Sequence, residues 1–233
     1  MRTFSPRLDI LPPEQRRLWP ELAPTVDLDF VLYGGTAIAL RLGHRPSVDF
    51  DFFSEAPLDR AAIRAALPFV DRSMVVQDEP DAWTMLVPAE GGDRGQVKVS
   101  FFGGITFGRV GEPDRTADGV MVAASLRDLL ATKVKVVLQR AEAKDYRDVA
   151  RMLEAGASLA DGLASAVALY GPGFQPSESL RALVYFRDGD LASLPDSEKL
   201  TLVEAVKAVR LLPEARILSR HLGAERGGPS LGR

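Results

Sequence analysis

The chain has 233 residues, a hydrophobic fraction of 46%, a charged fraction of 26% and a formal net charge of −3. This length is enough for one large domain or two small ones, and the composition is that of an ordinary globular protein. The balance of charge argues against a nucleic-acid coat or a membrane-surface protein, and leaves room only for a local basic face. The lack of cysteine in the sequence excludes disulfides, zinc–thiolate sites and thiol nucleophiles.

The N-terminal segment is charged and interrupted by proline, and it reads MRTFSPRLDILPPEQRRLWPEL. It lacks an apolar stretch long enough for a signal peptide, and no part of the sequence approaches the roughly 18 apolar residues of a membrane span. We therefore expect a cytoplasmic protein without a membrane partner. The part EQRRLWPEL follows two prolines and is predicted to be a short helix, because proline is well tolerated where a helix begins.

A strand, a helix and a second strand are predicted next. The first strand is LDFVLYGG, an apolar run that ends in a glycine turn. The segment TAIALRLGH has alanine and leucine at helical spacing, with Thr36 as its expected N-cap and Gly43 as its expected stop. The segment SVDFDFF alternates apolar and polar residues with a period of two, which predicts a strand.

The remaining elements divide the chain into two parts. After an amphipathic helix in PLDRAAIRAALPFV, three strands are predicted in SMVVQDE, AWTMLVP and GQVKVSFFGG. From about Ser125 onward, apolar residues recur at spacings of three and four, which predicts a helical bundle. We therefore expect an α+β protein, with a mixed-sheet α/β domain at 1–118, a hinge at 111–120, a helical domain at 119–233 that closes a cleft, and a disordered tail from about 224.

Gly34 and Gly35 lie between a predicted strand and a predicted helix. A helix N-terminus offers free N–H groups and a partial positive charge, which suit a phosphate group, and glycine lets the backbone approach a ligand closely. A tight turn between strand and helix would explain the same glycines without a ligand. The pair alone does not decide between the two interpretations.

Asp49 and Asp51 are two residues apart on a predicted strand, so both would project from one face while Phe50 and Phe52 project from the other. Neighbouring acids repel each other unless a cation or water separates them. Mg²⁺ is commonly held by one or two carboxylates together with substrate phosphates. A half-exposed strand with solvated acids is the alternative, and the nearby glycine turn favours the metal site.

Basic residues occur in the loop HRPS and in the helical half. Arg45 and Ser47 are suited to bind anion oxygens, although a plain solvent loop would also explain them. We expect His44 to serve in the loop or as a helix cap. Four basic residues would share one face of a helix that ran without interruption through ATKVKVVLQRAEAKDYRDVARML: Lys133, Arg140, Lys144 and Arg151. Such a face could clamp a triphosphate opposite the acidic strand, and an exposed helix with local ion pairs is the alternative.

Together these stretches resemble the nucleotidyltransferase fold shared with DNA polymerase β. The stretch GGTAIALRLGHRPSVDFDFF looks like the signature of that fold. The later stretch SLRDLLATKVKVVLQRAEAKDYRDVARML is similar to the lysine-arginine and KDxxD region of the abortive-infection nucleotidyltransferase toxins (AbiEii/AbiGii). The likeness runs from about Phe30 to Leu153. Members of that family pair with an antitoxin in prokaryotes.

The resemblance implies two sets of functional residues. The nucleotide-binding set would be Gly34, Gly35, Thr36, Arg45, Ser47, Arg140 and Asp145. The catalytic set would be Asp49, Asp51, Lys133 and Asp148, of which the first two would ligate Mg²⁺ (or Mn²⁺). The implied reaction transfers a nucleoside monophosphate from an NTP to a tRNA end or a protein side chain and releases pyrophosphate. A cognate antitoxin protein is the implied partner.

One position departs from the pattern. Enzymes of this kind usually carry a third carboxylate on a later strand, and Ser100 stands where that acid is expected, with Lys98 on the same face. Serine is a poor base and a weak metal ligand, so Asp148 or Asp145 would have to substitute. Two alternatives therefore remain: a nucleotide-binding or interaction module without catalysis, and a nucleotidyltransferase that modifies a small molecule such as an antibiotic.

Overall fold

A computed structural model of the chain describes residues 1–89 and 95–224. Within these residues the strands form one mixed sheet in the order β1-β7-β8-β2-β3-β6-β5-β4. The strands are β1 (Thr3–Phe4), β2 (Val31–Tyr33), β3 (Asp49–Phe53), β4 (Met74–Glu79), β5 (Ala82–Pro88), β6 (Gln96–Phe102), β7 (Asp114–Thr116) and β8 (Val122–Ala123). The predicted meander of three strands is confirmed as β4, β5 and β6.

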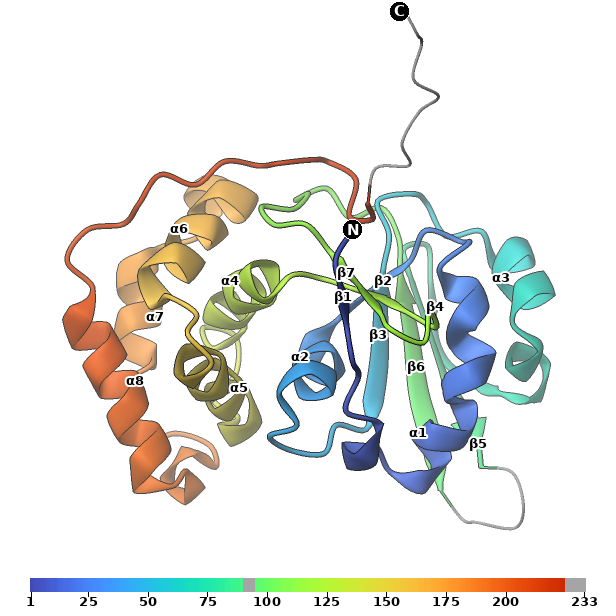
Figure 1. The fold of residues 1–233 in the computed structure, drawn as a ribbon, viewed down its shortest axis with the longest axis horizontal. Coiled ribbons are helices and arrows are strands. Elements are labelled where there is room, and N and C mark those ends of the chain that lie inside the picture. The colour runs from blue at the N-terminus through green and yellow to red at the C-terminus, as the bar shows by residue number, and fades with distance from the viewer. Residues whose placement is uncertain (90–94, 225–233) are drawn as a thin grey trace, which may run out of the picture.

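Helices cover both faces of the sheet. They are α1 (Pro13–Leu18), α2 (Gly34–Leu42), α3 (Arg60–Ala66), α4 (Leu126–Val136), α5 (Ala143–Glu154), α6 (Leu159–Tyr170), α7 (Pro176–Ala182) and α8 (Asp196–Ala208), with short 3-10 turns between several of them. Figure 1 shows α1 and α3 on one side of the sheet, and α2 with the later helices on the other. The predicted α+β class is therefore confirmed.

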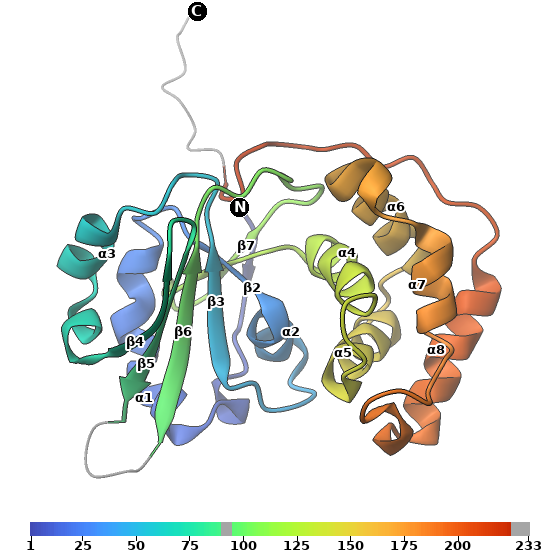
Figure 2. The ribbon, with the colours of Figure 1, turned by 180° about the vertical axis from the view of Figure 1, so that it is seen from behind.

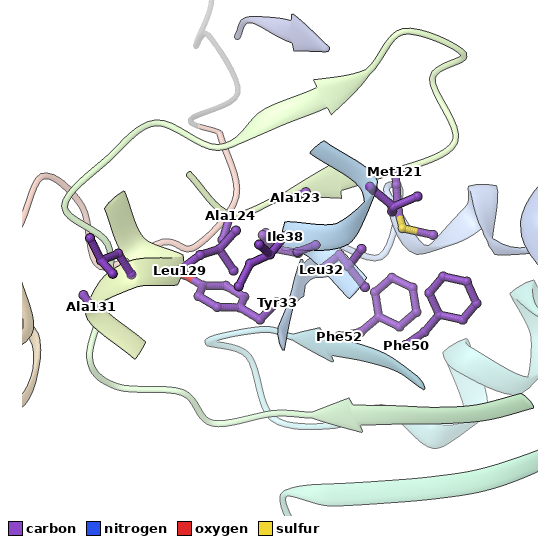
Figure 3. Close-up of a cluster of buried hydrophobic side chains, with 14 of the residues drawn as sticks. Leu32, Tyr33, Ile38, Phe50, Phe52, Met121, Ala123, Ala124, Leu129 and Ala131 are labelled. Atoms are coloured by element: carbon purple, nitrogen blue, oxygen red, sulfur yellow. The ribbon is translucent and has the colours of Figure 1, made fainter. Parts of the chain in front are cut away.

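Strand β3 shows why the alternating sequence forms this sheet. Phe50 and Phe52 are fully buried, whereas the residues between them face the opposite side. Phe50 packs against Trp19, and Phe52 stacks on Phe101 of the neighbouring strand with ring centroids 5.4 Å apart. In Figure 3 the same apolar cluster continues from these rings through Leu32 toward helix α4. The sheet and the first bundle helix therefore share one core.

Helix α2 begins earlier than the sequence predicts. Its first residue is Gly34 and its N-cap is Tyr33, so the prediction that Thr36 is the N-cap is wrong. Gly34 has a φ of +73°, which glycine adopts without steric cost and which lets the helix begin directly at the end of β2. The predicted stop is confirmed, because Gly43 takes the left-handed conformation that commonly ends a helix.

Two predictions about the boundary between the halves are wrong. The predicted hinge at 111–120 contains β7, and β8 continues the sheet beyond residue 118. The chain also returns to the sheet after α8, as Figures 1 and 2 show. There the Arg109 amide donates to the Ser219 carbonyl at 2.9 Å. Strand β8 at the start of the predicted helical domain thus belongs to the sheet, and an isolated bridge joins Ser219 near its end to Arg109. The part of the predicted disordered tail at 225–233 lies outside the described residues.

The long basic helix expected in the second half is interrupted. Helix α4 ends at Val136 and α5 begins at Ala143, so the chain reverses between them. The four basic residues therefore do not form one continuous stripe. Among the described residues no single helix is long and apolar enough to cross a membrane; α5 and α6 pass that test only as a pair, and the pair is bent by 119°.

Candidate active site

A pocket of about 400 Å³ opens between the sheet and the helical half. Ligand pockets commonly have volumes of about 300–1,000 Å³. Its walls come from β3, β6, the start of α2, the loop after α2, and α4 with the turn that follows it. The charged residues lining it among the described residues are Arg45, Asp49, Asp51, Lys98, Lys133, Arg140 and Lys144.

The acidic pair faces this pocket. Asp49 and Asp51 both line it from the same face of β3, as the alternation predicts. Burial raises the pKa of Asp51 above its ordinary value, and the charge of Asp49 raises it further, while Lys98, Ser100 and Lys133 oppose the shift. The two acids thus form a concentrated negative charge whose repulsion a bound cation would relieve.

The two glycines bring the first turn of α2 against the acidic pair. A Cβ atom on Gly34 would lie 2.7 Å from Oδ2 of Asp51, and one on Gly35 would collide with the Arg45 guanidinium. The first N–H groups of an α-helix have no partner within the helix, and the side chain of the N-cap residue, Tyr33, makes no capping bond to them. The glycines therefore leave backbone donors beside the carboxylates.

Lys133 connects the pocket to two buried acids behind it. Its Nζ lies 2.6 Å from Oδ1 of Asp145 and 2.7 Å from Oδ2 of Asp148. Both aspartates are fully buried, and they lie three residues apart on α5, so they share one helix face. Arg140 also donates from Nε to Asp145, at 2.7 Å. The acids hold two cationic side chains at the pocket wall.

Asp148 also anchors the loop between α2 and β3. Arg45 binds its two oxygens through Nε at 2.7 Å and Nη2 at 2.8 Å, and His44 contacts Oδ1 through Nε2 at 2.8 Å. Burial alone would raise the pKa of Asp148, but the bonds from His44 and Arg45 and the charge of Lys133 hold that pKa well below its ordinary value. Asp148 is therefore ionised and committed to its partners.

The structure separates the predicted site residues into two groups. Those that line the pocket are Gly34, Gly35, Arg45, Ser47, Asp49, Asp51, Lys133 and Arg140. Thr36, Asp145 and Asp148 lie behind it, all fully or almost fully buried. The Thr36 hydroxyl bonds the Asp49 carbonyl and lies 2.8 Å from the Ser47 hydroxyl oxygen, so it braces the loop and is not free for a phosphate.

Asp148 and Asp145 are buried in ion pairs with Lys133. They therefore do not take the place of the third carboxylate that is expected at Ser100. Ser100 lies opposite Asp51 in the strand register and is 1% exposed. Within residues 1–89 and 95–224, no group of three or more His, Cys, Asp or Glu side chains is placed to hold a metal ion. The site in the structure thus has two carboxylates, Asp49 and Asp51, and a serine at position 100 where the third is expected.

Several lining residues were not assigned to the site from sequence, and three of them lie on the two central strands. Lys98 and Phe102 lie on the cleft face of β6, and Phe53 lies on that of β3. The period of two could have found them, because they lie two positions from Ser100 or Asp51 on the same faces. Phe53 and Phe102 form an edge-to-face pair with centroids 5.1 Å apart, which gives the pocket an apolar wall.

Two solved structures share this architecture. The chain matches a proposed nucleotidyltransferase from H. pylori over 83% of its own length and 92% of the other, with a TM-score of 0.51 and 20% identity. It matches MenT4, a nucleotidyltransferase toxin from Mycobacterium tuberculosis H37Rv, over 82% of each chain, with a TM-score of 0.50 and 13% identity. The fold is that of the polymerase-β-like nucleotidyltransferases.

The family model described as the nucleotidyl transferase AbiEii toxin of Type IV toxin–antitoxin (TA) systems matches residues 17–205. The chain belongs to this family. The matched region contains every residue that lines the pocket. A relative from Aquifex aeolicus (strain VF5), the uncharacterized protein aq_aa25, is 32% identical over 124 residues, which span 52% of this chain and 56% of that protein. The chain thus matches about half the length of this relative.

Proposed function

We propose that the protein transfers a nucleoside monophosphate from an NTP to an RNA or protein acceptor, as the toxin of a toxin–antitoxin pair. The observation that carries the proposal is that Asp49 and Asp51 share one pocket with the glycine-lined start of α2 and with Lys133. Nucleotidyl transfer depends mainly on positioning and on neutralising phosphate charge, and this arrangement supplies both.

The triphosphate would bind on the cationic side of the pocket. The start of α2 offers backbone N–H donors, and Arg45, Arg140 and Lys144 add positive charge. Lys133 contacts two carboxylates, and a lysine ammonium has three donors, which leaves one for a phosphate oxygen. Asp145 and Asp148 act indirectly, because they orient the basic side chains.

The donor set fits Mg²⁺ or Mn²⁺. Mg²⁺ is usually bound by one or two carboxylates, substrate phosphates and water, and Asp49 and Asp51 are such a pair, on one face of β3. A bound ion would neutralise charge on the phosphates and on the leaving pyrophosphate. The start of α2 and the basic side chains would orient the triphosphate. Phe53 and Phe102 offer an aromatic surface against which the base of the nucleotide can pack.

The charge of the pocket supports a polyanionic acceptor. The lining carries five basic side chains and two acids within the described residues, whereas an aminoglycoside, which is a cation, would require an acidic pocket. A tRNA end matches this charge best, and a protein side chain is the second candidate. We propose a cognate antitoxin as partner on the basis of the family alone.

The proposal is tested by incubating the protein with each NTP labelled at the α-phosphorus, Mg²⁺, and either total tRNA or a protein extract. We expect label in one fraction with the wild type and none with Asp51→Asn. A different function, a nucleotide-binding module without catalysis, is favoured by Ser100, which stands where a third carboxylate is expected. That alternative predicts thermal stabilisation by NTP without any release of pyrophosphate, and measurable pyrophosphate would exclude it.

A further inference from the structure

The strand beside the acidic pair carries a cation and a hydroxyl in place of further acids. In the parallel pairing of β3 with β6, Asp49 lies opposite Lys98 and Asp51 lies opposite Ser100. The Lys98 Nζ is 3.6 Å from Oδ2 of Asp49. The ammonium group therefore lies within ion-pair distance of a proposed metal ligand, on the wall of the same pocket.

We infer that Lys98 takes the electrostatic place of a second divalent cation, so that this site holds a single Mg²⁺ or Mn²⁺ together with its nucleotide. The inference rests on the proposed function, because it concerns the same pocket and the same two carboxylates. In a two-metal site, two ions about 3.5–4 Å apart stabilise the attacking and leaving oxygens. The pocket of this protein would hold only one of them.

Charge is the first argument. The floor of the pocket has the two negative charges of Asp49 and Asp51 and the positive charge of Lys98. One divalent ion would be balanced there with the help of the nucleotide phosphates, whereas a second would be repelled by both the first ion and the ammonium. About half of the Lys98 side chain is exposed, so its ammonium group keeps contact with water.

The ligand set is the second argument. A second ion would need an anionic ligand on β6, and the residue opposite Asp51 is Ser100, whose hydroxyl is neutral and buried. Asp145 and Asp148 cannot move in as ligands, since both are buried in ion pairs with Lys133. Hard divalent cations bind carboxylates much better than isolated hydroxyl groups.

Metal stoichiometry tests the inference. Mn²⁺ is titrated into the full chain with each of the four α,β-methylene NTP analogues, and free Mn²⁺ is followed by electron paramagnetic resonance. We expect one bound Mn²⁺ per chain for the wild type. The double variant Lys98→Gln, Ser100→Asp should bind two, because it restores a third carboxylate and removes the competing ammonium.

A second measurement does not depend on the substitution of the buried Ser100. Lys98→Gln alone should raise the affinity for Mn²⁺ without nucleotide by about tenfold, because a like charge next to the ion is removed. Lys207→Gln is the matched control, since that lysine pairs with Glu204 on α8, and its Mn²⁺ affinity should equal that of the wild type.

Two bound Mn²⁺ ions in the wild type, or an unchanged Mn²⁺ affinity in Lys98→Gln, would overturn the inference and leave the proposed function standing. Absence of any Mn²⁺ binding by the wild type with all four analogues would overturn both. If the double variant does not fold, the Lys98→Gln measurement decides alone.

Discussion

At the scale of single residues, Asp51 is placed for function at a cost in stability. Its pKa is raised, first by burial and then by Asp49. A carboxyl group whose folded-state pKa lies above its unfolded value lowers stability as pH rises through that interval, so Asp51 lowers the stability of the fold above its unfolded pKa. Such a residue is expected where a ligand supplies the missing positive charge.

Asp51→Asn should therefore separate folding from function. We expect its thermal midpoint to be equal to or above that of the wild type, because a partly buried carboxyl group and its repulsion with Asp49 are removed. Pyrophosphate release should fall by at least about 100-fold, because a proposed metal ligand is lost. Calorimetry and a pyrophosphate assay measure the two effects, and a collapse of the fold would show that Asp51 is structural.

Gly34 is the second residue whose change is diagnostic. Gly34→Ala should cost about 1–2 kcal/mol for the positive φ, and its Cβ would in addition press on Asp51 Oδ2 at 2.7 Å. Gly43→Ala is the control, because it has a similar φ but meets the flexible Arg7 side chain away from the pocket. Both variants should lose similar stability in urea titrations, and only Gly34→Ala should also lose nucleotide binding. Equal binding by the two variants would argue against the role of the glycine turn.

At the scale of elements, helix α5 supports the pocket through its buried acids. Asp148→Asn leaves Arg45, His44 and Lys133 without their shared carboxylate. Removing one partner from a buried ion pair costs about 3–5 kcal/mol, so the urea midpoint should fall strongly and nucleotide binding should weaken. Glu154→Gln removes the partner of Arg151 in a partly exposed ion pair on the same helix, and it should cost no more than about 1 kcal/mol. Similar losses in both variants would contradict the supporting role.

The same acids predict a pH dependence. Burial raises the pKa values of Asp145 and Asp148, but their basic partners outweigh it, so both values lie below the ordinary 3.8. The stability they contribute is fully present above that value and is lost as pH falls through the folded-state pKa values. The free energy of unfolding of the wild type should therefore drop below about pH 4, and Asp148→Asn should show a shallower drop in the same titration. Parallel curves would contradict this assignment.

The elements also show what sequence can predict. Period-two alternation located β3 and β6 and placed both acids of β3 on one face, since that pattern depends only on the local backbone. The break between α4 and α5 was missed because apolar spacing continues through the reversal. The contacts of Asp148 with Lys133 and His44 were missed because they join residues 15 and 104 positions apart. Such contacts depend on tertiary packing, which periodicity does not encode.

At the scale of the whole molecule, the last described segment links the two halves. After α8 the chain is exposed, and it then pairs with Arg109 and buries Leu222 beside the sheet. The Nδ1 atom of His221 also lies 2.8 Å from Oε1 of Glu55. This segment extends beyond the family match, which ends at residue 205. Its contacts with Arg109 and Glu55 tie the end of the described chain to the part of the molecule that contains the sheet.

Leu222→Ala tests that link. Truncation of a buried leucine costs about 2–5 kcal/mol, and the released segment should exchange its amide hydrogens faster around Arg109. Leu218→Ala is the control on the same segment, because that side chain is 54% exposed and its loss should cost less than about 0.5 kcal/mol. Hydrogen exchange read by mass spectrometry distinguishes them, and unchanged protection near Arg109 in Leu222→Ala would contradict the link.

The central claim is that the pocket transfers the nucleotidyl group of an NTP, and the position of the transferred phosphorus tests it most directly. The wild type is incubated with Mg²⁺, acceptor RNA or protein, and one NTP labelled either at the α- or at the γ-phosphorus. We predict that the α-label becomes attached to the acceptor while the γ-label leaves as pyrophosphate. Transfer of the γ-label, or no attachment of the α-label with any NTP and either acceptor, would contradict the claim.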